Sequence, residues 1–430
     1  MSMGLSDTPP RDARREPGGY TPLPAAPTEP DSFRPPSPES VAGPLHADVG
    51  VLALLVDQYG SRWTSRHQIL TRLARYFHVT WLNPAPEWRR AFQHPRLRAR
   101  EGTVPGQPSS FIVREAALHQ SVFHHPGWLA RATTRARLRA ARASLVDRGC
   151  RKVVLYIWHS RFAPALDIVP HDLSVYHVYD EYSHAEVEQP IDPGEERLLR
   201  GVGQLITLSP TMFARKGVLN PHSVRIPNGV EYEAFAAPGP EPADLARIPR
   251  PRLGYAGFIK KQLDLELLHT LATRHPEWSF VFVGARRPHP EAAPVLERLS
   301  ALPNVHLLGG KRSTELARYP QHFDVCLMPY RRNDYTKYIS PLKLFEYLAG
   351  GRPVVSVPLP ALVDAPGLVM VASGVNEWEA ALARALGPEA NAAHLRAARQ
   401  AAARAHDWSG IARLIAELVT ARLAEVEHAS

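Results

Sequence analysis

The chain has 430 residues, of which 44% are hydrophobic, enough to form the cores of about two domains. Its two cysteines, Cys150 and Cys326, are too few for a disulfide framework and too far apart for a zinc motif, and they fit a reducing compartment. The sequence opens without the apolar core of a signal peptide, and its best apolar run, residues 49–56, has the length of a strand. We therefore expect a cytoplasmic protein whose contact with the inner face of a membrane, if it has one, is peripheral.

Positive charge is concentrated in one part of the chain. The net charge is +9, and residues 86–152 carry 14 arginines and lysines against 4 acidic residues, a local excess of +10. Such a stretch attracts anionic lipid, a phosphorylated acceptor or nucleic acid. A solvated arginine-rich helix explains the same composition, and both interpretations stay open at this point.

The first half of the chain alternates between strand and helix patterns. Residues 1–46 hold 11 prolines and few apolar residues, so we expect a disordered tail. A helix is predicted over 67–77, and the Ser209-Pro210 pair marks the start of another. An Asn228-Gly229 turn closes this half. The predicted buried strands are residues 49–57, 78–84, 151–160, 173–182 and 203–208.

A second set of alternating elements follows a proline-rich linker. Helices are predicted over 263–275 and 313–323. Two such sets indicate an α/β protein with two doubly wound parallel-sheet domains, whose ligands bind at the carboxyl ends of the strands. We expect the domains to span 47–235 and 236–405, followed by a helical segment over 406–430. In this half a strand followed by a loop is predicted over residues 252–261, 278–287 and 304–312, and further strands are predicted over 324–332 and 354–360.

The stretch YISPLKLFEYLAGGRPVV, residues 338–355, predicts a loop, a short helix and a strand. Ser340 suits the N-cap and Pro341 the first helical position. The Gly350-Gly351 pair can end the helix in the left-handed conformation.

Two charges lie on one side of this predicted helix. Lys343 falls in the first turn and Glu346 follows three residues later. Together they could hold phosphates at one end and sugar hydroxyls at the other. An exposed ion pair on a surface helix is the simpler alternative.

The order of several motifs is similar to that of a known family. The chain resembles GT-B glycosyltransferases, in particular glycosyltransferase family 4 and its bacterial surface-polysaccharide relatives, over about residues 49–425. The resemblance implies two Rossmann-like domains facing a cleft, with the acceptor on the first and a UDP- or GDP-linked sugar on the second. The motifs that carry it are DQYGSRWTSRHQILTRLARYFHVTWLNP, IPNGVEYEAF, RLGYAGFIKK, FVFVG, SPLKLFEYLAGGRPVV and HDWSGIARLIAEL.

The resemblance also implies roles for individual residues in binding the nucleotide sugar. Glu346 would hold the ribose, Tyr330 would lie near the donor sugar, and Gly309-Gly310-Lys311 would border the base. Gly60 would let the first loop approach the donor. The residues implied at the diphosphate are Gly257, Lys260, Lys261, Ser340, Leu342 and Lys343.

The chain departs from the family pattern at three positions. Tyr338 stands where a second glutamate usually touches the donor sugar, and Phe258 stands where an arginine often follows Gly257. The paired glycines of the first loop are Gly60-Ser61 here. These departures resemble a divergent branch with glucuronosyl- and mannosyl-type exopolysaccharide enzymes.

An inverting transfer needs a base for the acceptor hydroxyl. Asp180, at the end of a predicted strand, is the first candidate, and Glu181 is the second. His159, which ends another predicted strand, matches a family histidine near the donor sugar. Each has a structural alternative, because an aspartate there can cap a helix and a histidine can simply be packed and hydrogen-bonded. No Asp-x-Asp pair with a third ligand is present, so no metal is expected.

Other classes of protein remain open at this level. An epimerase or phosphorylase on the same scaffold would need a carboxylate-rich sugar pocket or a lysine-bound cofactor, and the sequence indicates neither. A non-catalytic basic binding protein would use residues 86–152 and leave the cleft empty. A dinucleotide dehydrogenase is disfavoured, because no G-x-G-x-x-G follows the first strand. We therefore expect an enzyme that moves a sugar from a nucleotide diphosphate to a saccharide or lipid-linked acceptor in cell-surface polysaccharide synthesis, and no nucleic-acid partner.

Overall fold

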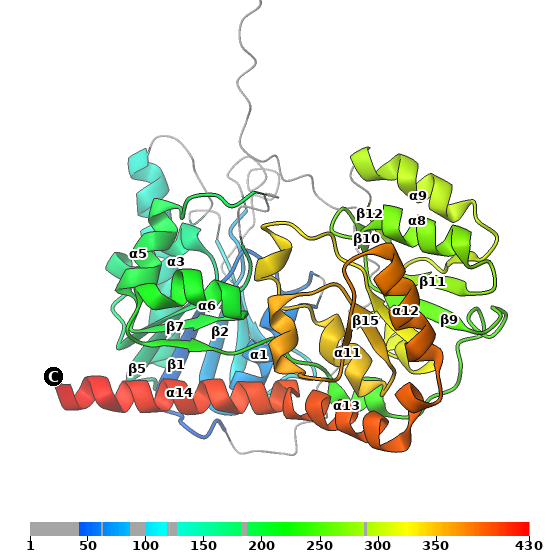
Figure 1. The fold of residues 1–430 in the computed structure, drawn as a ribbon. Coiled ribbons are helices and arrows are strands. Elements are labelled where there is room, and N and C mark those ends of the chain that lie inside the picture. Colours follow the sequence, from blue (N-terminus) through cyan, green and yellow to red (C-terminus); the bar gives the residue numbers. More distant parts are fainter. Residues whose placement is uncertain are drawn as a thin grey trace, which may run out of the picture. The chain divides into compact units, whose positions relative to one another are not determined.

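The computed structural model describes residues 43–61, 63–86, 100–117, 120, 127–181, 187–287 and 290–429 (Figure 1). Most of the predicted tail, up to residue 42, lies outside these ranges, as does part of the basic stretch 86–152. Across the described ranges, no helix combines the length and apolarity needed to span a bilayer.

The first sheet has eight strands in the order β3-β4-β2-β1-β5-β6-β7-β8, all parallel except β3, which runs antiparallel to β4. The chain winds outward from β1 in one direction and from β5 in the other, so the topological switch point lies between these two strands. Their sequences, VGVLAL and KVVLYI, are apolar apart from the first residue of β5, Lys152, because helices cover both faces of the sheet. The strands are β1 Val49–Leu54, β2 His78–Leu82, β3 Arg100–Thr103, β4 Phe111–Glu115, β5 Lys152–Ile157, β6 Leu173–Val178, β7 Gln204–Thr207 and β8 Ser223–Arg225.

The helices of this part begin where the sequence predicts good starts. Ser209 Oγ accepts from Met212 N at 3.3 Å and Pro210 is the first residue of its helix, which confirms the Ser209-Pro210 start. Asp192 caps another helix through Gly194 N at 2.9 Å. The helices are α1 Ser65–Leu73, α3 Gly127–Asp147, α4 Ala165–Ile168, α5 Pro193–Gly201 and α6 Pro210–Lys216, with 3₁₀ turns η2 Ser160–Phe162 and η3 Gly217–Leu219.

The second sheet has six parallel strands in the order β13-β11-β9-β14-β15-β16. It is wound outward from β9 and β14, so its switch point lies between them, and the prediction of two doubly wound sheets is confirmed. The strands are β9 Arg252–Ala256, β11 Ser279–Val283, β13 Val305–Leu307, β14 Val325–Met328, β15 Val354–Ser356 and β16 Met370–Val371, and a separate pair is β10 Ile259–Lys260 with β12 Arg286–Arg287. The helices are α8 Leu265–Arg274, α9 Ala293–Ser300, α10 Ser313–Leu316, α11 Lys343–Ala349 and α12 Val375–Leu386.

The end of the chain returns to the first sheet. Helix α7 (Tyr232–Ala236) follows β8, and α13 (Ala393–Ala405) leads into α14 (Trp408–Ala429). Trp408, Ile415 and Val419 of α14 belong to the same buried cluster as Val51 of β1. Figure 1 shows α14, in red, along the strands of the first sheet and beside α1. The last helix therefore belongs to the core of the first sheet, although the second sheet precedes it in sequence.

Candidate active site

Three loops at the carboxyl ends of the second sheet contain glycines in the positive-φ region. Gly257, Gly284 and Gly309 follow β9, β11 and β13, with φ of 140°, 155° and 73°. Gly257 N donates to Val283 O at 2.7 Å, and Gly284 N donates to Gly309 O at 2.8 Å. A Cβ on Gly284 would lie 2.0 Å from the carbonyl oxygen of Gly257. The loops pack backbone to backbone, which only glycine permits.

Lys343 of α11 lies directly against the first of these loops. Its ammonium is 5.1 Å from the centroid of the Tyr255 ring, and a Cβ on Gly257 would come within 2.4 Å of it. Tyr347, one turn further along α11, accepts a hydrogen bond at 2.9 Å from the amide of Ala256. This contact fixes α11 on the end of β9 and places a cation beside the switch point, where ligands of such sheets bind.

Glu346 lies close to two buried tyrosines. Burial raises the pKa of Tyr330, and the charge of Glu346 raises it further. Burial likewise raises the pKa of Tyr255, to which Tyr330 and Glu346 contribute. Lys343 and Glu346 are both half-buried, so neither is the fully exposed surface charge of the simpler alternative. Lys343 and Glu346 therefore both lie beside the ends of β9 and β14.

Lys260, the last residue of β10, and Lys261, which follows it, add positive charge next to this site. Lys260 is exposed on β10 and pairs in register with Arg287 on β12. The Arg287 guanidinium carbon stacks 4.4 Å from the centroid of the Phe258 ring. The phenylalanine that replaces the family's arginine therefore supports an arginine from the next loop. Sequence reasoning missed Arg287, although its place after FVFVG was a signal.

The predicted N-cap role of Ser340 is wrong. Helix α11 begins at Lys343, and Leu342 occupies the N-cap position without a side-chain cap. Ser340 instead accepts from Asn228 N at 3.3 Å through Oγ and from Asn228 Nδ2 at 2.8 Å through its carbonyl oxygen. The Ser340 hydroxyl is bound by the Asn228 turn, and Ser340 lies two residues before the N-cap position of α11. The helix end is as predicted, since Gly351 has φ of 70°.

Leu342 packs beside the buried cluster of the first sheet that includes Trp408. Lys311, of the loop predicted to border the base, forms an ion pair with Asp244 at 2.7 Å. Gly60 lies in the exposed loop after β1, and a Cβ there would meet nothing within 4 Å. Steric demands inside the protein therefore do not explain a glycine at position 60.

Asp180 follows β6 and contacts a segment of the second half. Its carboxylate accepts from the Tyr335 hydroxyl at 3.2 Å and from the amide of Glu181 at 2.9 Å. Burial and the charge of Asp180 raise the pKa of Tyr335. His159, after β5, accepts from Arg161 N at 3.1 Å through Nδ1, which is the hydrogen-bonded alternative for this residue.

Glu181 belongs to a buried ion cluster. Lys216 is fully buried and lies 3.1 Å from Glu181 and 2.9 Å from Glu195. Arg215 adds a second contact to Glu181 at 3.6 Å. The Glu181 carboxylate is thus engaged by two cations. These contacts favour a structural role for Glu181.

Tyr338, which replaces the family's second glutamate, packs among buried residues of the first sheet. Its hydroxyl donates to Glu188 at 2.6 Å, and its carbonyl oxygen accepts from Ser209 Oγ at 2.7 Å. Lys337 adds an ion pair with Glu188 at 2.8 Å. This position therefore joins the two sheet regions, and its side chain is occupied in doing so.

No group of three or more potential ligands among the described residues could hold a metal ion. The available positive charge near Gly257 comes from lysine and arginine side chains.

Comparisons with known proteins show what the chain is similar to. Residues 250–388 match the family model described as glycosyl transferases group 1. Residues 250–388, called the group 1 domain below, are thus similar to group 1 glycosyl transferases. The glycines at 257, 284 and 309, together with Lys343 and Glu346, all lie within the group 1 domain.

One curated relative and several solved structures are similar to longer parts of the chain. The putative teichuronic acid biosynthesis glycosyltransferase TuaH of Bacillus subtilis (strain 168) is 30% identical over 241 residues, 55% of this chain and 54% of the relative. The match thus spans about half the length of that relative. A structure from E. coli described as trehalose-6-phosphate bound with UDP-2-fluoro glucose has a TM-score of 0.60 at 12% identity, over 86% of this chain and 98% of that chain. WaaG, a glycosyltransferase involved in lipopolysaccharide biosynthesis, has a TM-score of 0.55 at 15% identity, over 86% and 99%. The fold is GT-B, as the resemblance implied.

Proposed function

We propose that the chain is a glycosyltransferase that moves a hexosyl or glucuronosyl unit from a UDP- or GDP-linked sugar to a saccharide or lipid-linked acceptor. The product would be part of a cell-surface polysaccharide. The group 1 domain would bind the donor, and the region of the first sheet would bind the acceptor. We place the reaction in the cytoplasm, with peripheral contact to the inner membrane face where a lipid-linked acceptor is used.

The position of Lys343 supports this proposal most strongly. Its ammonium lies against Gly257 at the switch point of the sheet, and Glu346 follows one turn later. A carboxylate can accept from the two vicinal hydroxyls of a ribose. The cation and the carboxylate are therefore spaced to hold the diphosphate and the ribose of one nucleotide.

Departure of the diphosphate requires positive charge, because negative charge grows on it as the glycosidic bond breaks. The amides of Gly257 and Gly284 already donate to backbone carbonyls, so they do not supply it. Lys343, Lys260 or Lys261, and Arg287 on the neighbouring strand are the groups we assign to this role. On this account no metal is needed.

The acceptor hydroxyl must lose its proton during transfer. We propose Asp180 as the base of an inverting reaction, since it follows β6 and lies next to Tyr335 of the group 1 domain. His159 is the second group at this edge of the first sheet. The ion cluster around Glu181 makes it the least suited of the three.

Calorimetry with UDP and GDP tests the donor site. Glu346→Ala and Lys343→Ala should each weaken the bound nucleotide by about 1–3 kcal/mol, because each removes a charge-assisted hydrogen bond. Glu417→Gln, on an exposed part of α14, is the matched control and should bind as the wild type does. Wild-type affinity in both site variants would refute the donor site. A thermal-shift screen of nucleotide sugars then identifies the donor.

A further inference from the structure

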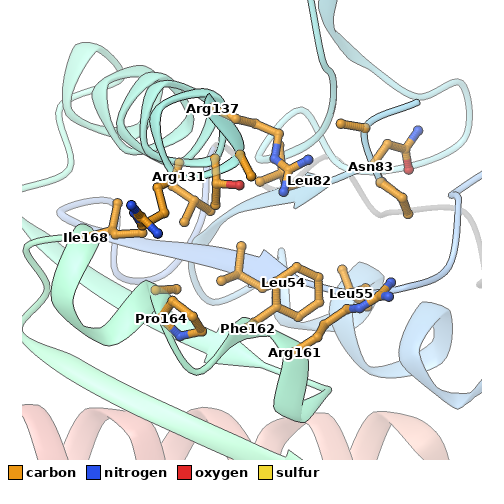
Figure 2. A pocket seen from close by; sticks show the side chains of 16 residues that line it. Leu54, Leu55, Leu82, Asn83, Arg131, Arg137, Arg161, Phe162, Pro164 and Ile168 are labelled. Atoms are coloured by element: carbon orange, nitrogen blue, oxygen red, sulfur yellow. The ribbon is translucent and has the colours of Figure 1, made fainter. Parts of the chain in front are cut away.

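A cavity lies at the switch point of the first sheet. Its volume is about 370 Å³, within the range of small-molecule sites. Leu54 and Leu55 at the end of β1, Leu82 at the end of β2 and Phe162 after β5 supply an apolar lining. Figure 2 shows Arg131 and Arg137 reaching it from α3, with Phe162 and Arg161 on the opposite side.

Arg137 brings a buried charge to this cavity, and the described residues supply no counter-charge for it. It is only 9% exposed, and its Nε has no hydrogen-bond partner within the described part of the chain. Burial lowers the pKa of Arg137 to about 10, and the charge of Arg161 adds to that effect. None of the described residues that line the cavity is acidic. A buried guanidinium without a counter-charge is costly to the empty protein, so its retention points to an anionic ligand.

The rest of the lining restricts the kind of anion. A free sugar phosphate needs partners for its hydroxyls, but the amide of Asn83 is already engaged by Tyr59 N at 2.8 Å and by Glu115 at 2.5 Å. The other lining residues are apolar, apart from Arg131, Thr134, Arg137 and Arg161. The ligand must therefore combine a strongly anionic group with a hydrocarbon body.

We propose that this arginine pocket binds a phosphate ester that carries a hydrocarbon chain, as the anchoring end of the glycosyl acceptor. The assignment to an acceptor rests on the glycosyltransferase function proposed above, whereas the binding chemistry does not. An adjacent hollow of about 500 Å³ shares Arg161 and Pro164 and is lined by His159, Ser160 and Asp192. A saccharide attached to the phosphate would find polar partners there, beside His159.

Decyl phosphate, kept below its micelle concentration, is a suitable probe for calorimetry on the full chain. We expect it to bind at least about tenfold more tightly than inorganic phosphate, which lacks the hydrocarbon chain, and than decyl glucoside, which lacks the phosphate. Arg137→Gln should weaken decyl phosphate by about tenfold or more. Arg139→Gln, an exposed arginine of the same helix, should leave it unchanged.

Two further measurements separate binding from a structural role. Arg137→Gln should melt no lower than the wild type without ligand, since it removes an unpaired buried charge. Thr134→Trp should abolish decyl phosphate binding by filling the cavity without changing its charge. Inorganic phosphate that binds as tightly as decyl phosphate would overturn the proposal. So would an Arg137→Gln protein that melts lower and keeps wild-type affinity.

The same proteins are titrated with UDP and GDP. Loss of nucleotide binding with decyl phosphate binding intact would reject the donor site alone. The opposite result would reject the arginine pocket alone.

Discussion

Two buried histidines make the first sheet region sensitive to acid. His67 Nδ1 accepts from Thr64 N at 3.1 Å and its Nε2 contacts Tyr59 O at 3.1 Å, so the neutral ring carries its proton on Nε2. His177 stacks on Trp158 with ring centroids 4.2 Å apart, and its Nε2 is buried without a partner among the described residues. The doubly protonated, charged form of each ring is therefore disfavoured, because one nitrogen of His67 already accepts a backbone hydrogen bond and one nitrogen of His177 is buried without a partner among the described residues.

The magnitude follows from the pKa values. Burial lowers the pKa of His67 to about 4 and that of His177 to about 3, against about 6.5 in an unfolded chain. Below about pH 6.5 the unfolded chain therefore binds protons that the folded chain does not, and the free energy of unfolding falls as the pH falls. From neutral pH to about pH 5 each histidine removes roughly 2 kcal/mol, about 1.4 kcal/mol for each of roughly 1.5 pH units.

Urea unfolding at about pH 7.5 and about pH 5 measures this loss. His177→Phe keeps a ring against Trp158 but cannot titrate. Between the two pH values, the free energy of unfolding of this variant should decline by about 2 kcal/mol less than that of the wild type. This difference does not depend on how much the substitution itself changes the stability at one pH. Equal declines in the two proteins would show that His177 is not held neutral and would refute the reasoning.

Two other substitutions test features of the backbone and core. Gly284→Ala should weaken nucleotide binding by about tenfold or more in calorimetry, because the new Cβ would lie 2.0 Å from the Gly257 carbonyl and push the loops apart; unchanged affinity would show that these loops do not shape the site. Lys216→Met should lower the free energy of unfolding by about 3–5 kcal/mol in urea titrations, since Glu181 and Glu195 would stay buried without their cation. A change below about 1 kcal/mol would mean that water already reaches this cluster.

Much of the fold was predictable because the parallel strands are apolar on both faces. The runs that become β1, β5 and β11 contrast clearly with the loops that follow them. Strand β3 was missed, since its sequence REGT is exposed and has no apolar pattern. The site beside Gly257 was predictable from local spacing, because Lys343 and Glu346 lie on one short helix.

Features that depend on contacts between distant segments were not predictable. The engagement of Ser340 by Asn228 brings together residues 112 positions apart, so the local N-cap rule failed there. Arg137 had a detectable signal, since Thr133, Arg137 and Ala141 repeat every four residues along the buried stripe of α3. From composition alone, α3 was predicted as a whole to be either a solvated helix or a basic binding surface. Composition does not distinguish the buried Arg137 from the exposed arginines of the same helix.

The central claim is that the diphosphate of a nucleotide sugar rests on Lys343. Calorimetry of UDP against uridine, and of GDP against guanosine, measures the contribution of the diphosphate directly in the wild type and in Lys343→Met. We predict that one diphosphate binds the wild type at least about tenfold more tightly than its nucleoside and that Lys343→Met removes most of this difference while leaving the nucleoside unaffected. An undiminished preference for the diphosphate in Lys343→Met would contradict the account.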